Sequence, residues 1–170
     1  MKMIVRFAAC ATLVAAHATL AAPVFMSGDW ARLACDAWNA DATLTSKLHD
    51  SGWDANNKNR GHKTMRIARS DCPSSPLAEL RIAPRDARAH CIEAGAATAA
   101  ALDYDVDYLM SAETRRWLEM GRGEYGPMRA MMFGRLAFDG PMGEAMGNMG
   151  PFESFQLLVG RVPAESRACP

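Results

Sequence analysis

Three neighbouring segments between residues 63 and 95 have the alternating pattern of short β-strands, and they restrict the fold more than any other feature of the chain. They read KTMRIAR (63–69), AELRIAP (78–84) and RAHCIEAG (88–95), and the sequences SDCPSSP and RDA separate them. Alternation places every second side chain on one face of a strand, and Pro, Asp and Ser mark the turns. The chain must therefore build a sheet.

Two later segments add strands to this sheet. In ALDYDVDYLM (101–110) the apolar and aromatic residues alternate with three aspartates, and MFGRLAFDG (132–140) alternates again. The faces expected to point inward are Tyr104, Val106, Tyr108 and Met110 on the first segment, and Met132, Leu136 and Phe138 on the second. The aspartates lack the Gly and the final carboxylate of a calcium loop, which favours a polar strand face and no metal site.

Helical patterns precede and follow the strands. Residues 27–48 repeat apolar positions at three- and four-residue spacing behind a candidate N-cap, Ser27 or Asp29. Further helices are predicted at 111–121, 127–131, 142–149 and 152–160. The order of elements predicts a single α+β domain, with one sheet covered on one face by helices.

The amino-terminal 21 residues have the features of an export signal. Lys2 and Arg6 form a basic head, an apolar run follows, and small residues precede a predicted cleavage site after Ala21. Removing these two basic residues from 19 leaves 17, against 19 acidic residues, or a net charge of −2. The mature chain, residues 22–170, is therefore expected to be a periplasmic, soluble protein with no membrane anchor and no affinity for nucleic acid.

Four cysteines follow the predicted leader. An even number of cysteines in an exported protein indicates two disulfides, and the spacings contain no C-x-x-C motif that would indicate a zinc or redox site. Three pairings are possible. We expect Cys72–Cys91, within the strand-rich stretch, and Cys35–Cys169, which would tie the tail to the first helix.

Motifs of catalysis are missing from the sequence. It contains no G-x-S-x-G pentapeptide, no paired histidines of the H-x-x-x-H type, no P-loop, and no G-x-G-x-x-G after a strand. The sequence therefore gives no reason to predict an enzyme or a cofactor.

Methionines are concentrated between residues 130 and 150. Met142, Met146 and Met149 would share one face of a helix at i, i+4 and i+7. Thioether side chains of this kind form ordinary cores, line cavities for apolar ligands of varied shape, or bind Cu(I). The residues alone leave these alternatives open.

The segment from Trp117 to Gly140, WLEMGRGEYGPMRAMMFGRLAFDG, resembles the C-terminal half of sterol carrier protein type 2 domains. The matching positions are Trp117, Gly123, Glu124, Pro127, Met131 or Met132, Gly134, Leu136 and Gly140. Upstream, DWARLACDAWNADATL (29–44) resembles the opening helix of the bacterial single-domain members, and Trp53 stands where they often carry a second Trp. The chain departs from the pattern at Gly126, where an acidic residue is common, and after Gly140, where Met and Phe replace a Leu-rich helix.

The resemblance implies a five-stranded, mainly antiparallel sheet with helices over one face and an apolar tunnel between the layers. It implies non-catalytic binding and transfer of a hydrophobic small molecule, a sterol or steroid or a fatty-acyl lipid, with a donor membrane or a partner enzyme as further partners. The residues expected to line the tunnel are Tyr104, Val106, Tyr108, Met110, Trp117, Met132, Leu136, Phe138, Met142, Met146, Phe152 and Phe155. Two other hypotheses are a periplasmic Cu(I)-binding protein that uses Met142, Met146 and Met149, and an accessory module of a partner enzyme.

Overall fold

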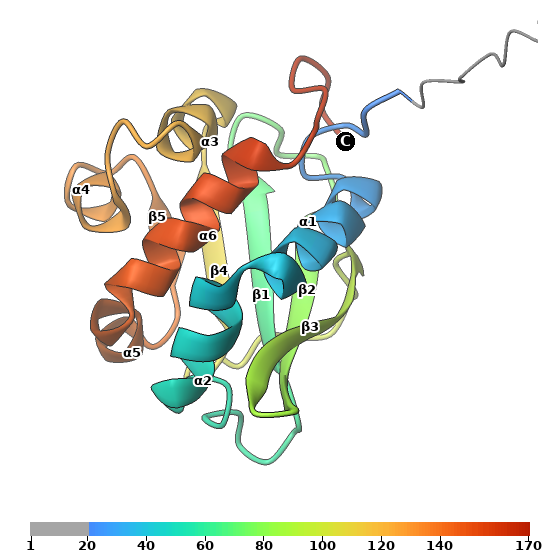
Figure 1. Ribbon diagram of the computed structural model, residues 1–170. Coiled ribbons are helices and arrows are strands. Elements are labelled where there is room, and N and C mark those ends of the chain that lie inside the picture. The colour runs from blue at the N-terminus through green and yellow to red at the C-terminus, as the bar shows by residue number, and fades with distance from the viewer. Residues whose placement is uncertain (1–20) are drawn as a thin grey trace, which may run out of the picture.

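The computed structural model describes residues 21–170, so the predicted leader lies outside the described residues except for Ala21. One five-stranded sheet, in the order β3-β2-β1-β4-β5, is covered on one face by helices (Figure 1). The strands are β1 (Lys63–Arg69), β2 (Ala78–Arg85), β3 (Arg88–Ala96), β4 (Tyr108–Ala112) and β5 (Ala137–Asp139). The helices are α1 (Gly28–Ala40), η1 (Thr43–Lys47), α2 (Leu48–Asp50), α3 (Thr114–Gly121), α4 (Pro127–Met132), α5 (Met142–Gly147) and α6 (Met149–Arg161).

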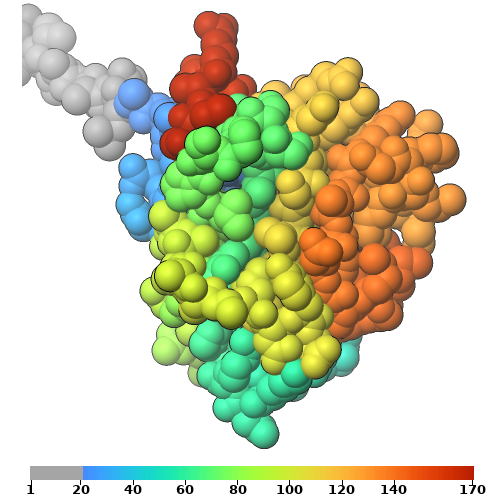
Figure 2. All heavy atoms as spheres, turned by 180° about the vertical axis from the view of Figure 1, so that it is seen from behind, coloured from blue at the N-terminus to red at the C-terminus, as the bar shows by residue number. Residues whose placement is uncertain are grey.

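The sheet is mixed, and the predicted α+β class with one helix-covered face is confirmed. β1–β2, β2–β3 and β4–β5 pair antiparallel, whereas β1 and β4 pair parallel, with Met65 opposite Tyr108. A parallel pair needs a crossover connection. Here the segment between β3 and β4 crosses the face turned away from α1 and α6 (Figure 2), where Arg66 donates to the carbonyls of Thr98 and Ala100.

Helix α1 begins at the predicted cap and packs its apolar stripe on the sheet. The Ser27 side chain accepts a hydrogen bond from the Trp30 backbone N–H at 3.2 Å, as expected for an N-cap. Trp30 and Trp38 are fully buried, and the Trp38 indole donates to the Ala89 carbonyl of β3 at 2.8 Å. The predicted helix over 27–48 is interrupted at Asp41, whose side chain accepts from the backbone of Thr43.

The fourth strand is shorter than the alternation predicts. Residues 101–107 form a loop and turn, and β4 begins only at Tyr108. The aspartates cause the difference because they bond to the backbone rather than line a strand face: Asp107 accepts from the N–H groups of Asp103 and Thr64. At the other end, β4 extends to Ala112, so α3 begins at Thr114 and not near Ser111.

The methionine-rich segment does not form one helix through Met149. Helix α5 ends at Gly147, Asn148 leaves helical geometry with φ −121° and ψ 33°, and α6 begins at Met149. Gly147 and Gly150 flank the break, and residues without a Cβ weaken helix continuity. Met142 and Met146 are thus on a different helix from Met149.

Both predicted disulfide pairings are wrong. The structure joins Cys35 to Cys91 and Cys72 to Cys169, with Cα–Cα distances of 5.4 and 5.6 Å. β2 lies between β1 and β3, so Cys72, beyond the end of β1, cannot reach Cys91 in β3. α1 packs on β3 instead, which places Cys35 against Cys91.

The carboxyl-terminal tail runs to the end of β1 rather than to α1. The guanidinium of Arg69 donates to the carbonyls of Ser166 and Ala168 at 2.8 and 2.6 Å, and Ser75 donates to the carbonyl of Pro170. These contacts bring Cys169 beside Cys72. The tail also pairs with the start of the described chain, where Val24 and Glu165 form a parallel bridge.

Helices α3 and α6 cross at two glycines. A Cβ atom on Gly121 would lie 2.5 Å from the Cα of Gly160, so neither position accepts a side chain without a shift of backbone. Helix α6 is further held by its last residue, Arg161, which donates to Asp41 at 3.1 Å, and near its middle by Ser154, which donates to the same carboxylate at 3.0 Å. No helix within residues 21–170 combines the length and apolar character needed to cross a bilayer.

The first prediction concerns the disulfides. Proteolysis of the unreduced protein followed by mass spectrometry should yield linked peptides containing Cys35 with Cys91 and Cys72 with Cys169. Replacing Cys72 and Cys169 together by Ser should lower the free energy of unfolding by about 2–5 kcal/mol, because the bridge closes a long loop in the unfolded chain. A linked peptide joining Cys72 to Cys91 would contradict the fold described for the tail.

The second prediction concerns the helix crossing. Gly121→Ala should destabilise the protein by about 1–3 kcal/mol in chemical denaturation, because the new methyl group meets the backbone of Gly160. Gly143→Ala is the matched control, since no atom lies near its Cβ position in α5. That variant should be neutral or gain up to about 1 kcal/mol from helix propensity; equal effects of the two changes would contradict the crossing.

Candidate ligand-binding site

A small apolar cavity lies between the sheet and the helices, beneath the junction of α5 and α6. Its volume is about 20 Å³, which is room for about one water molecule. The lining residues come from α1, η1, α2, the loop after α2, β1, β4, α5, the α5–α6 junction and α6: Trp38, Leu44, Leu48, Trp53, Met65, Tyr108, Ala145, Asn148, Pro151, Phe152 and Phe155. An open tunnel is therefore not present in this conformation, but its expected position between sheet and helices is occupied by an apolar cavity.

Five aromatic rings line the cavity, and a sixth, that of Phe138, connects two of them so that each ring contacts the next. We call them the aromatic belt: Phe155, Trp38, Trp53, Tyr108, Phe138 and Phe152. Neighbouring ring centroids are 5.2–6.2 Å apart, and the contacts are edge-on or tilted, which is the preferred geometry of aromatic pairs. Rigid flat side chains of this kind can close on one another or on an apolar guest.

The structure brings four of the predicted tunnel residues to this site. Tyr108, Phe152 and Phe155 line the cavity, and Phe138 joins the belt between Tyr108 and Phe152. Four others are buried but outside the cavity lining: Val106, Met110, Trp117 and Leu136. The Trp117 indole, for example, donates to the carbonyl of Ala68 at 2.8 Å and fixes α3 on the sheet.

The remaining four predicted residues lie at the surface. Tyr104 and Met132 are 49% and 72% exposed, and Met142 and Met146 are 46% and 42% exposed. Tyr104 is in the turn that replaces the start of the predicted strand, and Met132 ends helix α4 rather than opening β5. Met142 and Met146 share the outer side of α5, whose buried residue is Ala145.

Sequence reasoning missed the part of the site that comes from the first 65 residues. Trp38 lies on the buried face of α1, and Trp53 was recognised only as part of the family pattern; neither was assigned to the site. Leu44 and Leu48 come from the π-helical turn and the short helix after α1, and Met65 from the alternating strand β1. Only the parallel pairing of β1 with β4 places Met65 opposite Tyr108.

A polar cluster borders the cavity where α5 approaches the sheet. The carboxylate of Glu144, in α5, accepts hydrogen bonds from the Lys63 ammonium and from the Tyr108 hydroxyl, the latter at 2.5 Å. Its second oxygen accepts from the Asn56 amide at 2.7 Å. Trp53 donates to the Tyr108 oxygen at 2.8 Å. Three donors thus converge on one carboxylate beside an apolar space.

Lys63 is the most unusual member of the cluster because its side chain is fully buried. Its ammonium lies 4.5 Å from the ring centre of Trp53 and 5.2 Å from that of Tyr108, within the range of cation–π attraction. Burial lowers the pKa of Lys63, and the hydrogen bond to Glu144 opposes that shift. Burial, with the hydrogen bond to Glu144, raises the pKa of Tyr108, so the phenol remains a donor at neutral pH.

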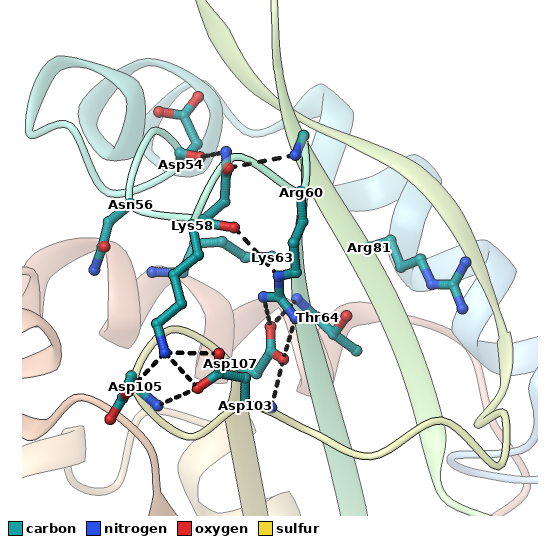
Figure 3. A network of polar contacts seen from close by, with 12 residues as sticks. Asp54, Asn56, Lys58, Arg60, Lys63, Thr64, Arg81, Asp103, Asp105 and Asp107 are labelled. Atoms are coloured by element: carbon teal, nitrogen blue, oxygen red, sulfur yellow. Dashed lines mark hydrogen bonds and ion pairs between the residues drawn. The ribbon is translucent and has the colours of Figure 1, made fainter.

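The loop that carries Trp53 and Asn56 is fixed to the turn before β4 by ion pairs (Figure 3). Arg60 donates two hydrogen bonds to Asp107, at 2.7 and 2.9 Å, in a bidentate pair. Lys58 bonds to Asp103 and Asp105 at the surface, at 2.8 and 2.6 Å. In Figure 3 the ends of Asn56 and Lys63 extend to the same side of this loop.

Asp107 is the buried centre of these contacts. Burial alone would raise its pKa, but the Arg60 guanidinium and the N–H groups of Asp103 and Thr64 outweigh that effect and hold the pKa below its usual value. The aspartates predicted to form a strand face are therefore structural anchors. Within residues 21–170 no group of three or more His, Cys, Asp or Glu side chains is arranged to hold a metal ion.

Comparisons with known proteins agree with this architecture. A sequence model described as the SCP-2 sterol transfer family matches residues 49–153. The crystal structure of sterol carrier protein 2 superposes with a TM-score of 0.53 at 14% identity, covering 81% of this chain and 98% of that one. The solution structure of a conserved hypothetical protein from Thermus thermophilus, described as possibly a sterol carrier protein, gives 0.50 at 15% identity, covering 85% and 96%. No curated protein sequence matches significantly. Identities this low show a shared fold alone.

The third prediction tests the anchor role of Asp107. Asp107→Asn should lower the free energy of unfolding by about 3 kcal/mol at neutral pH, because it leaves the partly buried Arg60 without its anion. Asp105→Asn is the control, since Asp105 pairs with Lys58 in solvent and should cost less than about 1 kcal/mol.

The same variant has a defined pH dependence. Because the folded pKa of Asp107 lies below the unfolded value of 3.8, the wild-type carboxylate stabilises the fold fully above that pH. Its contribution disappears as the pH falls from 3.8 through the folded pKa. The difference in denaturation midpoint between wild type and Asp107→Asn should therefore shrink on acidification; a constant difference would contradict the ion pair.

Proposed function

The chain belongs to the SCP-2 sterol transfer family, as the sequence resemblance predicted, and on that premise we propose that it binds and transfers a hydrophobic small molecule in the periplasm without catalysing a reaction. The ligand class is a sterol or steroid, or a lipid with a fatty-acyl chain. The observation that carries the proposal is the aromatic belt, which surrounds an apolar cavity between the sheet and the helices.

Ligand entry requires the cavity to grow, and the contacts of α5 and α6 support one place for that movement. From Ser154 onward, helix α6 is held by the glycine crossing with α3 and by Asp41. The junction above the cavity, by contrast, contains Gly147 and Gly150, and no neighbouring atom lies near the Cβ position of either glycine. We therefore assign entry to a movement of α5 and the first turn of α6 away from β4 (Figure 1).

The energetics suit a carrier that must also release its ligand. Burying roughly 300–400 Å² of apolar ligand surface at ~25 cal/mol/Å² supplies about 7–10 kcal/mol. Association and ordering costs of about 4 kcal/mol or more leave at most about 6 kcal/mol, which corresponds to an affinity of tens of micromolar or weaker. The opening of α5 draws on the same free energy, so the empty protein is expected to be closed.

The proposed location rests on the leader sequence and the disulfides. Cys35–Cys91 and Cys72–Cys169 are bridges of the kind that form and persist in oxidising compartments. The predicted cleavage after Ala21 would leave Phe25 and Met26, which are buried, as an integral part of the mature domain.

The fourth prediction tests both the ligand and its site. Protein purified from the periplasm should carry a stoichiometric apolar molecule in native mass spectrometry, released on unfolding and identified after solvent extraction. The purified, emptied protein should take up cholesterol or hexadecanoate. A wild-type protein that is isolated empty and takes up neither would overturn the proposal.

A pair of variants in α5 locates the site. Ala145→Phe, which fills the cavity, should weaken uptake about tenfold or more, because the added ring occupies space the ligand needs. Gly143→Phe places the same ring in open space on the same helix and should leave uptake within about twofold. Equal affinities of both variants would place the ligand elsewhere.

A further inference from the structure

The polar cluster at the edge of the cavity has the composition of a carboxylate-binding site. Lys63, Tyr108 and Asn56 supply an ammonium, a hydroxyl and an amide N–H, and all three donate to the two oxygens of Glu144. Charge-assisted bonds of this kind are short and strong. The donors come from β1, β4 and the loop before β1, whereas the acceptor comes from the separate helix α5.

The three donors are held in place without help from Glu144. Tyr108 receives a hydrogen bond from Trp53, and the Lys63 ammonium lies against the rings of both residues. Asn56 belongs to the loop that Arg60 and Lys58 fix to the turn at 103–107. A site with its donors already positioned loses little free energy to ordering when an anion binds.

The acceptor, in contrast, belongs to a weakly held element. Helix α5 has six residues, two of them glycines, and no side chain caps its first turn. Ala145 is its one buried residue, and Glu144 is its only polar side chain. The Glu144 carboxylate is therefore the main bond between α5 and the sheet.

Opening the cavity by lifting α5 would break this bond and leave the Lys63 ammonium buried without an anion. An unpaired buried charge costs several kcal/mol. A neutral ligand would leave that cost uncompensated, but a ligand with its own carboxylate would replace Glu144 on the same three donors. Its apolar part would enter the space between the rings of Trp53 and Tyr108 and those of Phe152 and Phe155.

We propose that Lys63, Tyr108 and Asn56 form a head-group site for an apolar carboxylic acid, and that Glu144 occupies this site in the empty protein. The inference rests on the proposed carrier function and narrows its ligand to acids with a long chain or a steroid body. Glu144 is then a specificity-determining residue, because only a competing anion compensates for its displacement.

The test compares acids with alcohols of the same shape. Isothermal titration should measure binding of hexadecanoate and hexadecan-1-ol, and of 5β-cholan-24-oic acid and the corresponding 24-alcohol. Wild-type protein should bind at least one acid about tenfold or more tightly than its alcohol. The two pairs distinguish a fatty acid from a steroid acid. In Lys63→Met the acid and the alcohol should bind within about twofold of each other.

Two further variants keep the result interpretable. Lys47→Met removes an exposed lysine in η1 that is no part of the polar cluster, and it should retain the wild-type preference for the acid. Glu144→Gln keeps Lys63 in place and removes the internal competitor, so affinity for the acid should rise several-fold relative to the alcohol. This second variant gives a result even where Lys63→Met fails to fold.

The possible outcomes separate the two proposals. Equal binding of acid and alcohol by wild type, or a preference that Lys63→Met retains, would overturn the head-group site while leaving the carrier function intact. A gain in acid affinity with Glu144→Gln and a loss of preference with Lys63→Met would support it. If neither acids, alcohols nor cholesterol bind, the carrier function fails and the head-group site fails with it.

Discussion

The buried carboxylate of Asp107 is the contact on which the arrangement of the site depends. β1 and β4 pair in parallel although the chain between them passes through two other strands, so no short turn sets their register. Asp107 supplies that link, because it immediately precedes β4 and accepts the N–H of Thr64 at the start of β1. Arg60 closes the same carboxylate from the loop before β1. With Met65 opposite Tyr108, Lys63 and Tyr108 reach the carboxylate of Glu144 together, and the Trp53 ring packs on Tyr108.

The cavity combines an apolar interior with one charged point at its edge. Six aromatic side chains contact one another around the cavity. Glu144 plays the corresponding part for polar groups, because it satisfies donors that would be costly to leave unpaired. Under the proposed function, the protein's own rings occupy the place of an apolar ligand body, and its own carboxylate occupies the place of a head group.

Much of the fold could be predicted from sequence because local patterns determine it. Strand β1 was predicted at its observed bounds, since alternation and flanking turn residues agree there.

The site was predicted only where residues on later elements face inward, as Tyr108, Phe152 and Phe155 do. The role of Asp107 was predicted wrongly. In an alternating run, a buried aspartate cannot be distinguished by sequence from a solvent-facing aspartate until its partner, Arg60, is known. Lys63 was not assigned to the site for the same reason: a lysine that opens a strand resembles a surface residue, until the rings of Trp53 and Tyr108 are placed against its ammonium. The disulfide pairing depended on strand order, which spacing between cysteines does not contain.

The crossing of Gly121 and Gly160 has a mechanical consequence. It lies near the last residue of α6, whereas Phe152 contacts the cavity near the first residue and Phe155 contacts it at the middle of the helix. A tilt of α6 about the glycine crossing would therefore move Phe152 further than Phe155. At 1.5 Å per residue Phe152 lies roughly 12 Å from Gly160, so a tilt of about 10° would displace it by about 2 Å. Under the proposed function, a rotation of this size would widen the space between the rings, and it would stretch the hydrogen bond from Ser154 to Asp41.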